Sequence, residues 1–317
     1  MKVLVTGAGG FVGKGLVPYL ERQGHTVVRA LRMAKEDNEV GIGDIGPDTD
    51  WRVALGGVEA VVHLAARVHV MQAEDLSSQQ AFHRVNTAGT LNLARQAASA
   101  GVRRLVFLSS VKVLGEEGVL TAASIPRPAD AYGQSKWAAE QGLHTVATNT
   151  GLEVVILRPP LIYGPGVGAN FARLMHWVRC GVPLPLGGVR NRRSLLALGN
   201  LVDAVEWVLR HPAAAGRTYL LSDGEDVSTP DLIRHLAHAL GRSARLLTVP
   251  PFLLLGLGKL LGRRAEIHRL LGSLVVDASA IRAELGWSPP FTLAAGLDDL
   301  VAREGEMERS HSCHPIS

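Results

Sequence analysis

The first residues of the chain constrain its fold more than any other part. An apolar run, KVLVT, leads directly into the glycine-rich segment GAGGFVG and then into a helical pattern from about Val12 to Gln23. Gly7 permits a tight turn, Gly10 lets the backbone approach a pyrophosphate, and Gly13 allows close packing of the helix. Amides at the start of that helix would face phosphate groups. This segment therefore predicts a strand, turn and helix that bind a dinucleotide.

Short β-branched runs alternate with helical patterns through the first half of the chain. The later runs are HTVVRALR, AVVHLAA, RRLVFLSS and LEVVILRP, with helices expected at about 87–100 and 134–148. Fully apolar strands separated by helices indicate a parallel sheet covered on both faces. We predict an α/β fold, namely a doubly wound parallel Rossmann sheet with a smaller, mostly helical C-terminal substrate-binding part.

Glycine and proline become frequent after Tyr163, and helical patterns follow. We predict a dinucleotide-binding Rossmann domain over 1–165, to which residues of about 195–222 return, and a substrate-binding part over 166–302. The tail, 303–317, has few apolar residues and no periodicity, so we expect it to be disordered. The helices expected in the second half lie at about 200–210, 229–240 and 278–285.

Cysteine content and charge limit the classes of function. The 317 residues include only two cysteines, Cys180 and Cys313, whose spacing supports neither a disulfide framework nor a metal site. The N-terminus begins as a strand and lacks the features of a signal peptide, so we expect a cytoplasmic protein. A net charge of +4 suits an anionic ligand. The RNRR segment at 190–193 has no interleaved aromatic residues, so we predict no nucleic-acid partner.

The most apolar stretch runs from Pro250 to Leu261 and is too short to span a bilayer. Glycines and Lys259 interrupt it. We predict a buried or pocket-edge helix over 250–264 and no stable membrane insertion. Contact of this leucine-rich helix and its basic end with a membrane surface is the alternative.

The end of the second predicted strand bears on the choice of coenzyme. It reads Arg29-Ala-Leu-Arg32, with no acid to bind the ribose hydroxyls of NAD. Either arginine could pair with a 2′-phosphate, which favours NADP(H) and leaves NAD(H) open; ordinary surface arginines are the alternative. Asp44, in the segment GDI, could accept a hydrogen bond from the adenine amine or could be an ordinary turn residue.

Tyr132 and Lys136 carry the predicted chemistry. A spacing of four places the phenol and the ammonium on one helix face, where the cation could lower the pKa of the phenol. Hydride transfer at a carbinol carbon needs such a group, because a proton moves with the hydride. The run LVFLSS places Ser109 and Ser110 at the carboxyl edge of the sheet, where ligands bind in open α/β folds.

Together these motifs resemble the extended short-chain dehydrogenases, which include UDP-sugar 4-epimerases, nucleotide-sugar dehydratases and 4-ketoreductases. The likeness spans about residues 1–300 through TGAGGFVG, HLAA, VNTAGT, LSSVKVLG, YGQSK, LRPPLIYGPG, NRRSLLALGNLVDA and DASAIRAELGW. It implies that Tyr132 is the general acid/base, that Lys136 tunes it and binds the nicotinamide ribose, and that Ser110 binds the reacting sugar oxygen. Asn86 would shape the site, or else cap a helix. The residues expected at the NAD(P) cofactor are Gly7, Gly10, Phe11, Val12, Gly13, Arg32, Asp44, Ile45, Leu64, Ala65, Ala66, Asn86, Tyr132, Lys136 and Pro159.

The resemblance also implies a nucleotide-sugar substrate and a homodimer formed through the helices that follow Asn86 and contain Tyr132. Arg193 matches an arginine that contacts the nucleotide diphosphate in family members, and a planar bidentate donor suits that task. Arg192 is an equal geometric candidate. Asn170 and Phe171 follow the GPG turn and could face the substrate, although Phe171 could belong to the core. The residues expected at the substrate are Ser110, Asn170 and Arg193.

The residues after Ser110 bear on the reaction. Dehydratases of this family carry an Asp-Glu pair there, whereas this chain has Val111-Lys112, so dehydration is disfavoured. Leu161 stands where epimerases and dehydratases often have Asn, and Leu114 where epimerases usually have Tyr. Together with the segments SSVKV, PADAYGQSKW and NRRSL, these residues make the chain resemble bacterial reductases of UDP-4-keto-6-deoxy-N-acetylhexosamines, which form UDP-N-acetylquinovosamine for surface polysaccharide. We therefore predict C4 reduction.

Two alternatives to reduction stay open. The first is a UDP-sugar 4-epimerase with tightly bound NAD, which would use identical catalytic residues. The second, more remote, is a non-catalytic dinucleotide-binding sensor. Sensors of that kind often lose the acid/base tyrosine, whereas this chain retains Ser110, Tyr132 and Lys136 together.

Overall fold

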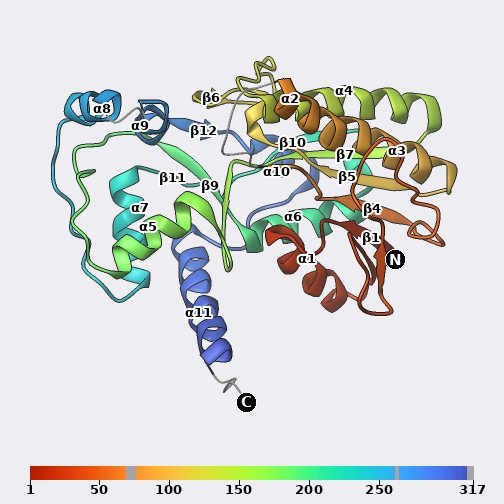
Figure 1. The fold of residues 1–317 in the computed structure, drawn as a ribbon, viewed down its shortest axis with the longest axis horizontal. Helices are drawn as coiled ribbons and strands as arrows, with labels where there is room; N and C mark the ends of the chain where they lie inside the picture. Colours follow the sequence, from red (N-terminus) through yellow and green to blue (C-terminus); the bar gives the residue numbers. More distant parts are fainter. Residues whose placement is uncertain (69–75, 261–263, 313–317) are drawn as a thin grey trace.

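A seven-stranded parallel sheet forms the centre of the protein (Figure 1). The computed structural model describes residues 1–68, 76–260 and 264–312. The strand order is β10-β7-β5-β4-β1-β2-β3, which confirms the predicted doubly wound α/β fold. The strands are β1 (Lys2–Thr6), β2 (Thr26–Leu31), β3 (Glu39–Gly41), β4 (Ala60–His63), β5 (Arg104–Leu108), β7 (Glu153–Arg158) and β10 (Thr218–Leu220).

Helices cover both faces of this sheet, as Figure 1 shows. Alternate residues of β1 point to opposite sides, so that Val3 and Val5 pack into one apolar core and Leu4 into the other. The first core is closed by α1 (Phe11–Arg22), α6 (Leu198–Arg210) and α10 (Ser279–Leu285). The opposite face carries α2 (Leu76–Phe82), the π-helix η1 (His83–Gly89), α3 (Thr90–Ser99) and α4 (Ala131–Thr150).

A second, smaller sheet of five strands lies in the other part of the molecule. The prediction of a mostly helical C-terminal part did not include it, because its strands are only two to five residues long and show no readable alternation. Its strands are β11 (Asp226–Val227), β9 (Arg193–Ala197), β12 (Leu274–Val276), β6 (Gly118–Leu120) and β8 (Leu161–Tyr163). The helices of this part are α5 (Ala169–Arg179), α7 (Thr229–Ala239), α8 (Pro251–Leu260), α9 (Arg264–Leu271) and α11 (Leu293–Ser312).

The buried carboxylate of Asp223 holds the two sheets together. It accepts hydrogen bonds from the Ala197 amide (2.8 Å), the Asn200 side chain (2.7 Å) and the Tyr163 hydroxyl (2.9 Å). Tyr163 and Ala197 belong to the second sheet, while Asn200 lies on α6, which covers the first. This network fixes the segment that returns to the Rossmann sheet.

The expectation of a disordered tail from Arg303 is wrong for residues 303–312, which continue α11. Leu297 and Leu300 are fully buried and dock the first half of the helix. Arg303 then pairs with Asp299 (2.8 Å), one turn earlier, so the polar half continues from a helix that tertiary contacts already hold. Residues 313–317, including Cys313, lie outside the described residues.

The leucine-rich helix α8 is less buried than predicted. Leu254 is buried in the core, whereas Phe252 and Leu253, among the side chains described on this helix, are exposed. Residues 261–263 lie outside the described residues. Within the described ranges, no helix combines the length and the apolar character that crossing a membrane requires.

Candidate active site

The predicted dinucleotide turn lies where the strand order reverses. From β1 the sheet grows in one direction through β2 and β3, and from β4 in the other, so the ends of β1 and β4 lie at the switch point where open α/β sheets bind ligands. Gly7 follows β1 with φ of +69°, and a Cβ there would lie 2.8 Å from the Ala65 nitrogen. The glycine turn and the Leu64-Ala65-Ala66 segment are therefore in close contact at this point.

The glycines of the turn differ in what surrounds them. A Cβ on Gly13 would lie 2.3 Å from the Gly7 carbonyl oxygen, whereas one on Gly10 would meet only that oxygen, at 3.2 Å. Gly10 is exposed and precedes α1 without a side-chain cap, so the first turn, with Phe11 and Val12, presents backbone amides. A pyrophosphate fits this cradle, because no side chain fills it.

The end of β2 presents one arginine to a coenzyme. Arg29 is held by Glu21 (3.0 Å) and Glu36 (3.6 Å). Arg32 pairs instead with Asp44 (2.9 Å), and both side chains are more than four-fifths exposed. The predicted phosphate-binding and adenine-binding residues are therefore direct neighbours, a pairing that their separation in sequence did not reveal.

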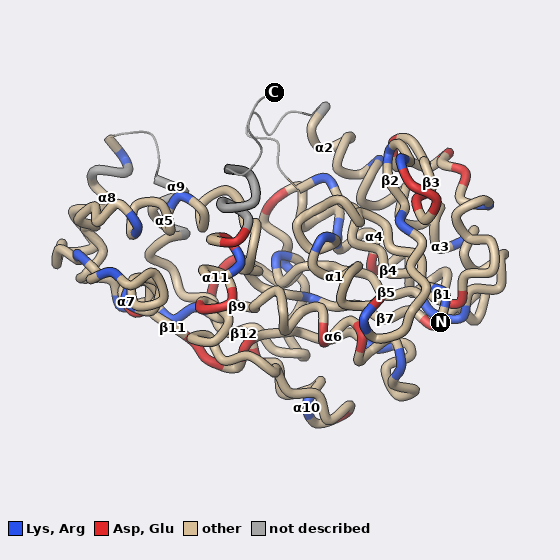
Figure 2. Tube along the Cα trace, turned by 90° about the horizontal axis from the view of Figure 1, so that it is seen from below, with Lys and Arg blue, Asp and Glu red and all other residues tan. Residues whose placement is uncertain are grey.

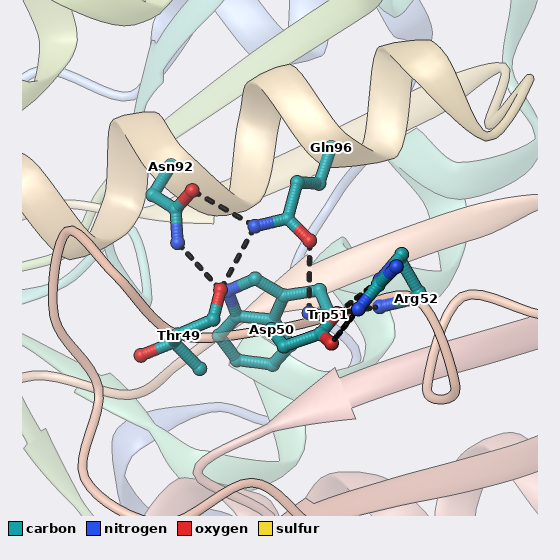
Figure 3. A network of polar contacts seen from close by, with 6 residues as sticks. All are labelled: Thr49, Asp50, Trp51, Arg52, Asn92 and Gln96. Carbon is teal, nitrogen blue, oxygen red and sulfur yellow. Dashed lines mark hydrogen bonds and ion pairs between the residues drawn. The ribbon is translucent and has the colours of Figure 1, made fainter.

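A hydrogen-bond network anchors the loop that carries Asp44 and Ile45. The Thr49 hydroxyl donates to the Asp44 carbonyl oxygen (3.1 Å). The Thr49 carbonyl accepts from Asn92 (2.7 Å) and Gln96 (2.8 Å) on α3, as Figure 3 shows. Ile45 packs so closely on η1 that a Cβ on Gly89 would come within 2.7 Å of it. Contacts within the protein thus hold the loop against α3 and η1.

Lys136 is buried at the end of β5. Its ammonium donates a hydrogen bond to the Leu108 carbonyl oxygen (2.8 Å) and lies 4.4 Å from the ring centroid of Phe107 and 6.0 Å from that of Tyr132. Burial lowers the pKa of Lys136 to about 7, and the nearby Glu140 carboxylate opposes this shift.

Tyr132 lies in the first turn of α4, with its ring edge-on to Phe82 on α2 (6.4 Å between centroids). Burial raises the pKa of its phenol, and the Asp130 carboxylate raises it further. The expected lowering of this pKa by Lys136 is not seen, and the Lys136 ammonium is bonded to the Leu108 carbonyl rather than to the phenol.

The two serines after β5 have different partners. The Ser110 hydroxyl oxygen accepts a bond from the Lys112 amide (3.2 Å) and caps the 3-10 helix η2 (Val111–Val113). Pro159 is buried opposite, and its carbonyl accepts from the Val111 amide (3.0 Å). Ser109 instead donates to the buried Glu140 carboxylate. Ser110 is therefore the serine available to a ligand.

A buried ion pair under the site escaped the sequence analysis. Glu140 is fully buried and pairs with Arg158 (2.5 Å), whose guanidinium lies 5.9 Å from the ring centroid of Trp137. The available signal was the position of Glu140, an acid four residues after Lys136 on the same helix face.

Asn86 does not cap a helix, as one interpretation held; it lies inside η1 and is buried. Its side-chain oxygen accepts from the Arg67 amide (2.8 Å), and its side-chain nitrogen donates to the Arg67 carbonyl (3.1 Å) and to the Ser135 hydroxyl (3.0 Å). It thereby ties the Leu64–Ala66 strand end to the helix of Tyr132.

His63, within the HLAA motif, makes a second set of buried contacts that the sequence analysis did not predict. The Thr90 hydroxyl donates to the Asn86 carbonyl (2.7 Å), so the same hydroxyl oxygen accepts from His63 Nε2 (2.9 Å). Nδ1 then accepts from the Thr6 hydroxyl (2.6 Å). Burial, followed by the charge of Lys136, lowers the pKa of His63 to about 3, which keeps the ring neutral.

The two arginines considered as substrate residues, Arg192 and Arg193, have different surroundings in the structure. The Arg193 guanidinium donates to the Gly272 carbonyl (3.1 Å), and burial lowers its pKa against the effect of Glu116. Arg192 is largely exposed and pairs with Asp226 (2.8 Å), so the two arginines are no longer equal candidates.

The two residues predicted after the GPG turn also differ. Asn170 is exposed in the first turn of α5, where its side chain accepts a bond from Arg173. Phe171 is a core residue stacked on Tyr163, with 5.8 Å between the ring centroids.

A cavity of about 680 Å³ opens between the segment that follows η2 and the end of α9. Leu114 and Glu116, which follow η2, form part of its wall with Arg127, and His268 and Gly272 form another part. Gly272 also accepts the Arg193 hydrogen bond, so the cavity adjoins that arginine.

Basic and acidic residues are mixed along the part of the chain that the structure describes (Figure 2). Figure 2 shows basic and acidic positions interspersed along the described chain rather than gathered into one basic stripe. Within the same described ranges, no three His, Cys, Asp or Glu side chains are grouped to hold a metal ion.

Comparison with known proteins identifies the family. Residues 3–222 match the model of the NAD dependent epimerase/dehydratase family. The chain is 44% identical to a UDP-glucose 4-epimerase of Vibrio cholerae over 93% of this chain and 92% of that protein. It is 27% identical to N-acetyl-alpha-D-glucosaminyl-diphospho-ditrans,octacis-undecaprenol 4-epimerase of Escherichia coli O157:H7, over 95% of each chain.

Solved structures share the fold. UDP-N-acetylglucosamine 4-epimerase from Bacillus cereus aligns with a TM-score of 0.79 and 22% identity, over 96% of this chain and 99% of that one. RMD from Pseudomonas aeruginosa, complexed with NADPH, aligns at 0.72 and 24%, over 96% and 99%. With residues 3–222 matched by the family model and 44% identity to a full-length relative, this chain belongs to the NAD dependent epimerase/dehydratase family.

Proposed function

We propose that the protein is a UDP-sugar 4-epimerase. The observation that carries this proposal is the 44% identity to a UDP-glucose 4-epimerase over 93% of the chain. The site supports it, because Tyr132 and Lys136 lie four residues apart on α4, and this helix contacts η2, the 3-10 helix that Ser110 caps. These relatives favour epimerisation over the reduction that Leu114 and Leu161 suggest.

Four residues have separate roles in such a reaction. Tyr132 takes the proton of the C4 hydroxyl and returns it after the keto sugar has turned over. Ser110 holds the C4 oxygen, and Lys136 holds the nicotinamide ribose and favours the phenolate by its charge. When bound, an oxidised nicotinamide would accept the hydride from C4 and return it, and its positive charge would further favour the phenolate. Arg193 orients the sugar through the diphosphate.

The coenzyme is NAD(P), held by the glycine cradle and the Asp44 loop. Arg32 supports NADP(H), because its guanidinium is exposed beside the adenine-binding candidate Asp44 and β2 ends without an acid. The protein acts in the cytoplasm as a homodimer formed through α3 and α4.

Reduction of a UDP-4-keto-6-deoxy-N-acetylhexosamine is the second candidate. Leu114 lines the cavity beside Arg193, and Leu161 at the start of β8 is half exposed. Apolar side chains suit a sugar with a methyl group at C6 better than one with a hydroxyl, because an unpaired hydroxyl is costly to bury.

The test incubates purified protein and either coenzyme with UDP-glucose and with UDP-N-acetylglucosamine. An epimerase forms the C4 epimer, detected by chromatography, without a net change in nicotinamide absorbance. Tyr132→Phe should lose this activity. Stoichiometric NAD(P)H consumption with the 4-keto-6-deoxy substrate, and no epimer from either hexose, would instead establish the reductase.

A further inference from the structure

Lys112 joins the two segments that carry the candidate catalytic hydroxyls. Its ammonium lies 2.5 Å from one carboxylate oxygen of Asp130 and 2.9 Å from Glu116. The other Asp130 oxygen accepts the Gly133 amide (2.7 Å) and thereby caps α4, the helix of Tyr132. One carboxylate thus connects Lys112 to the first turn of that helix.

The backbone of Lys112 makes the same connection. Its amide donates to the Ser110 hydroxyl oxygen (3.2 Å), which fixes the turn after β5. On the other side, a Cβ added to Gly133 would lie 2.8 Å from the Lys112 carbonyl oxygen, so η2 and α4 are in direct contact. Lys112 therefore contacts both Ser110 and the start of the Tyr132 helix.

The charge of Lys112 matters as much as its position. Among the described residues, Asp130 is the carboxylate that raises the pKa of Tyr132, and Lys112, about one-third exposed, forms an ion pair with it. Lys136, on the same helix, is a further charged group near the phenol. The α2 helix contributes the uncharged ring of Phe82. The ammonium of Lys112 consequently offsets the carboxylate that most disfavours the phenolate.

We propose that Lys112 is a positioning residue: by binding Asp130 it holds the Ser110 turn against the first turn of the Tyr132 helix and shields the phenol from the aspartate charge. The assignment rests on the proposed function for the roles of Ser110 and Tyr132. Lys112 thus has a structural role at a position where, by resemblance, dehydratases of the family carry an acid.

The test follows Tyr132 without substrate. The full-length chain, labelled with fluorotyrosine and saturated with NAD(P), is titrated by fluorine NMR; it has four tyrosines, and Tyr132→Phe assigns the signal. Fluorine lowers the pKa of the phenol into a measurable range. K112M should move the Tyr132 midpoint to higher pH by about half a unit, K112R should not, and D130N should move it to lower pH.

The decisive comparison is the double variant. In the D130N background, K112M should no longer move the Tyr132 midpoint, because the negative charge of Asp130, which Lys112 offsets in the wild type, is absent. E116Q is the matched control, since it removes the other partner of Lys112 and leaves the Asp130 pair intact. An equal shift in both backgrounds, or no shift for K112M, overturns the proposal. If K112M does not fold, K112Q replaces it in the same comparison.

Kinetics provide the second readout. At neutral pH, K112M should lower kcat about threefold with little change in KM, and activity should recover as the pH rises. An increase in KM alone would show that Lys112 binds substrate instead. Because the NMR titration needs no turnover, it tests Lys112 even if the UDP-hexoses prove not to be substrates.

Discussion

The ammonium of Lys136 donates a hydrogen bond to the backbone carbonyl of Leu108, 2.8 Å away at the end of β5. This contact joins the helix of Tyr132 to the sheet edge and holds the cation in a fully buried place. The pKa of Lys136 is about 7 there, well below its ordinary value of 10.5. Burial of this amine therefore costs stability while it prepares the site.

Lys136→Met should stabilise the fold and abolish turnover. Between about pH 7 and 10.5 the unfolded chain binds the lysine proton and the folded chain does not, so the free energy of unfolding rises with pH. The cost of Lys136 is complete below about pH 7 and disappears above 10.5. We expect a gain on the order of 2 kcal/mol at neutral pH that shrinks as the pH rises, measured by urea denaturation. A gain that does not change with pH would contradict this explanation.

His63 should make the wild-type protein sensitive to acid. Its pKa of about 3 lies below its ordinary value of 6.5, so unfolding takes up a proton throughout this window. Stability should fall by up to about 1.4 kcal/mol for each pH unit below 6.5. His63→Gln, which does not titrate, should flatten the dependence, whereas exposed His144→Gln should leave it unchanged. Parallel curves for wild type and His63→Gln would rule out this origin.

Breaking the Glu140–Arg158 pair should be more harmful than removing both charges. Arg158→Met leaves a fully buried carboxylate without its cation and should cost about 3–5 kcal/mol. The double variant Glu140→Gln, Arg158→Met should recover part of this loss. Thermal and urea unfolding of the single and double variants measure the coupling, and strictly additive effects would show that the pair does not act as a unit.

Arg32 and Arg29 offer a matched test of coenzyme choice. Arg32→Ala should weaken NADPH binding roughly tenfold, with little effect on NADH, because only NADPH carries the 2′-phosphate. Arg29→Ala should change neither affinity, since Glu21 and Glu36 already hold this guanidinium. Titration calorimetry measures the dissociation constants of NADPH and NADH for each variant, for comparison with those of the wild type. Equal losses for NADPH and NADH in Arg32→Ala would count against the NADP(H) preference.

The fold was predictable where local pattern decides it. The KVLVT run and the glycine spacing predicted β1, its turn and α1, and the closeness of Gly13 to Gly7 agrees with the expected tight helix packing. The second sheet was not predictable, because strands such as β11 have two residues and gain stability only from their neighbours.

The site was predictable to the level of residue type but not of orientation. Helical spacing brought Tyr132 and Lys136 together, yet the ammonium bonds the Leu108 carbonyl, an acceptor that only the tertiary fold places there. In the same way, the resemblance assigned the ligand role to Ser110, but the reason that Ser109 cannot share it, its hydrogen bond to the buried Glu140, depends on the tertiary fold. The Arg32–Asp44 pair depends on how two loops meet.

The most direct test of the proposed function is the fate of the C4 hydrogen. UDP-glucose and UDP-N-acetylglucosamine, each deuterated at C4, are incubated with the enzyme and unlabelled coenzyme, and the C4 epimers are analysed by mass spectrometry. Epimerisation within one site predicts that the epimer keeps its deuterium and that none appears in free coenzyme, with Tyr132→Phe inactive. Absence of any epimer, together with transfer of deuterium from labelled NAD(P)H to C4 of a 4-keto-6-deoxy substrate, would contradict the epimerase and establish a reductase.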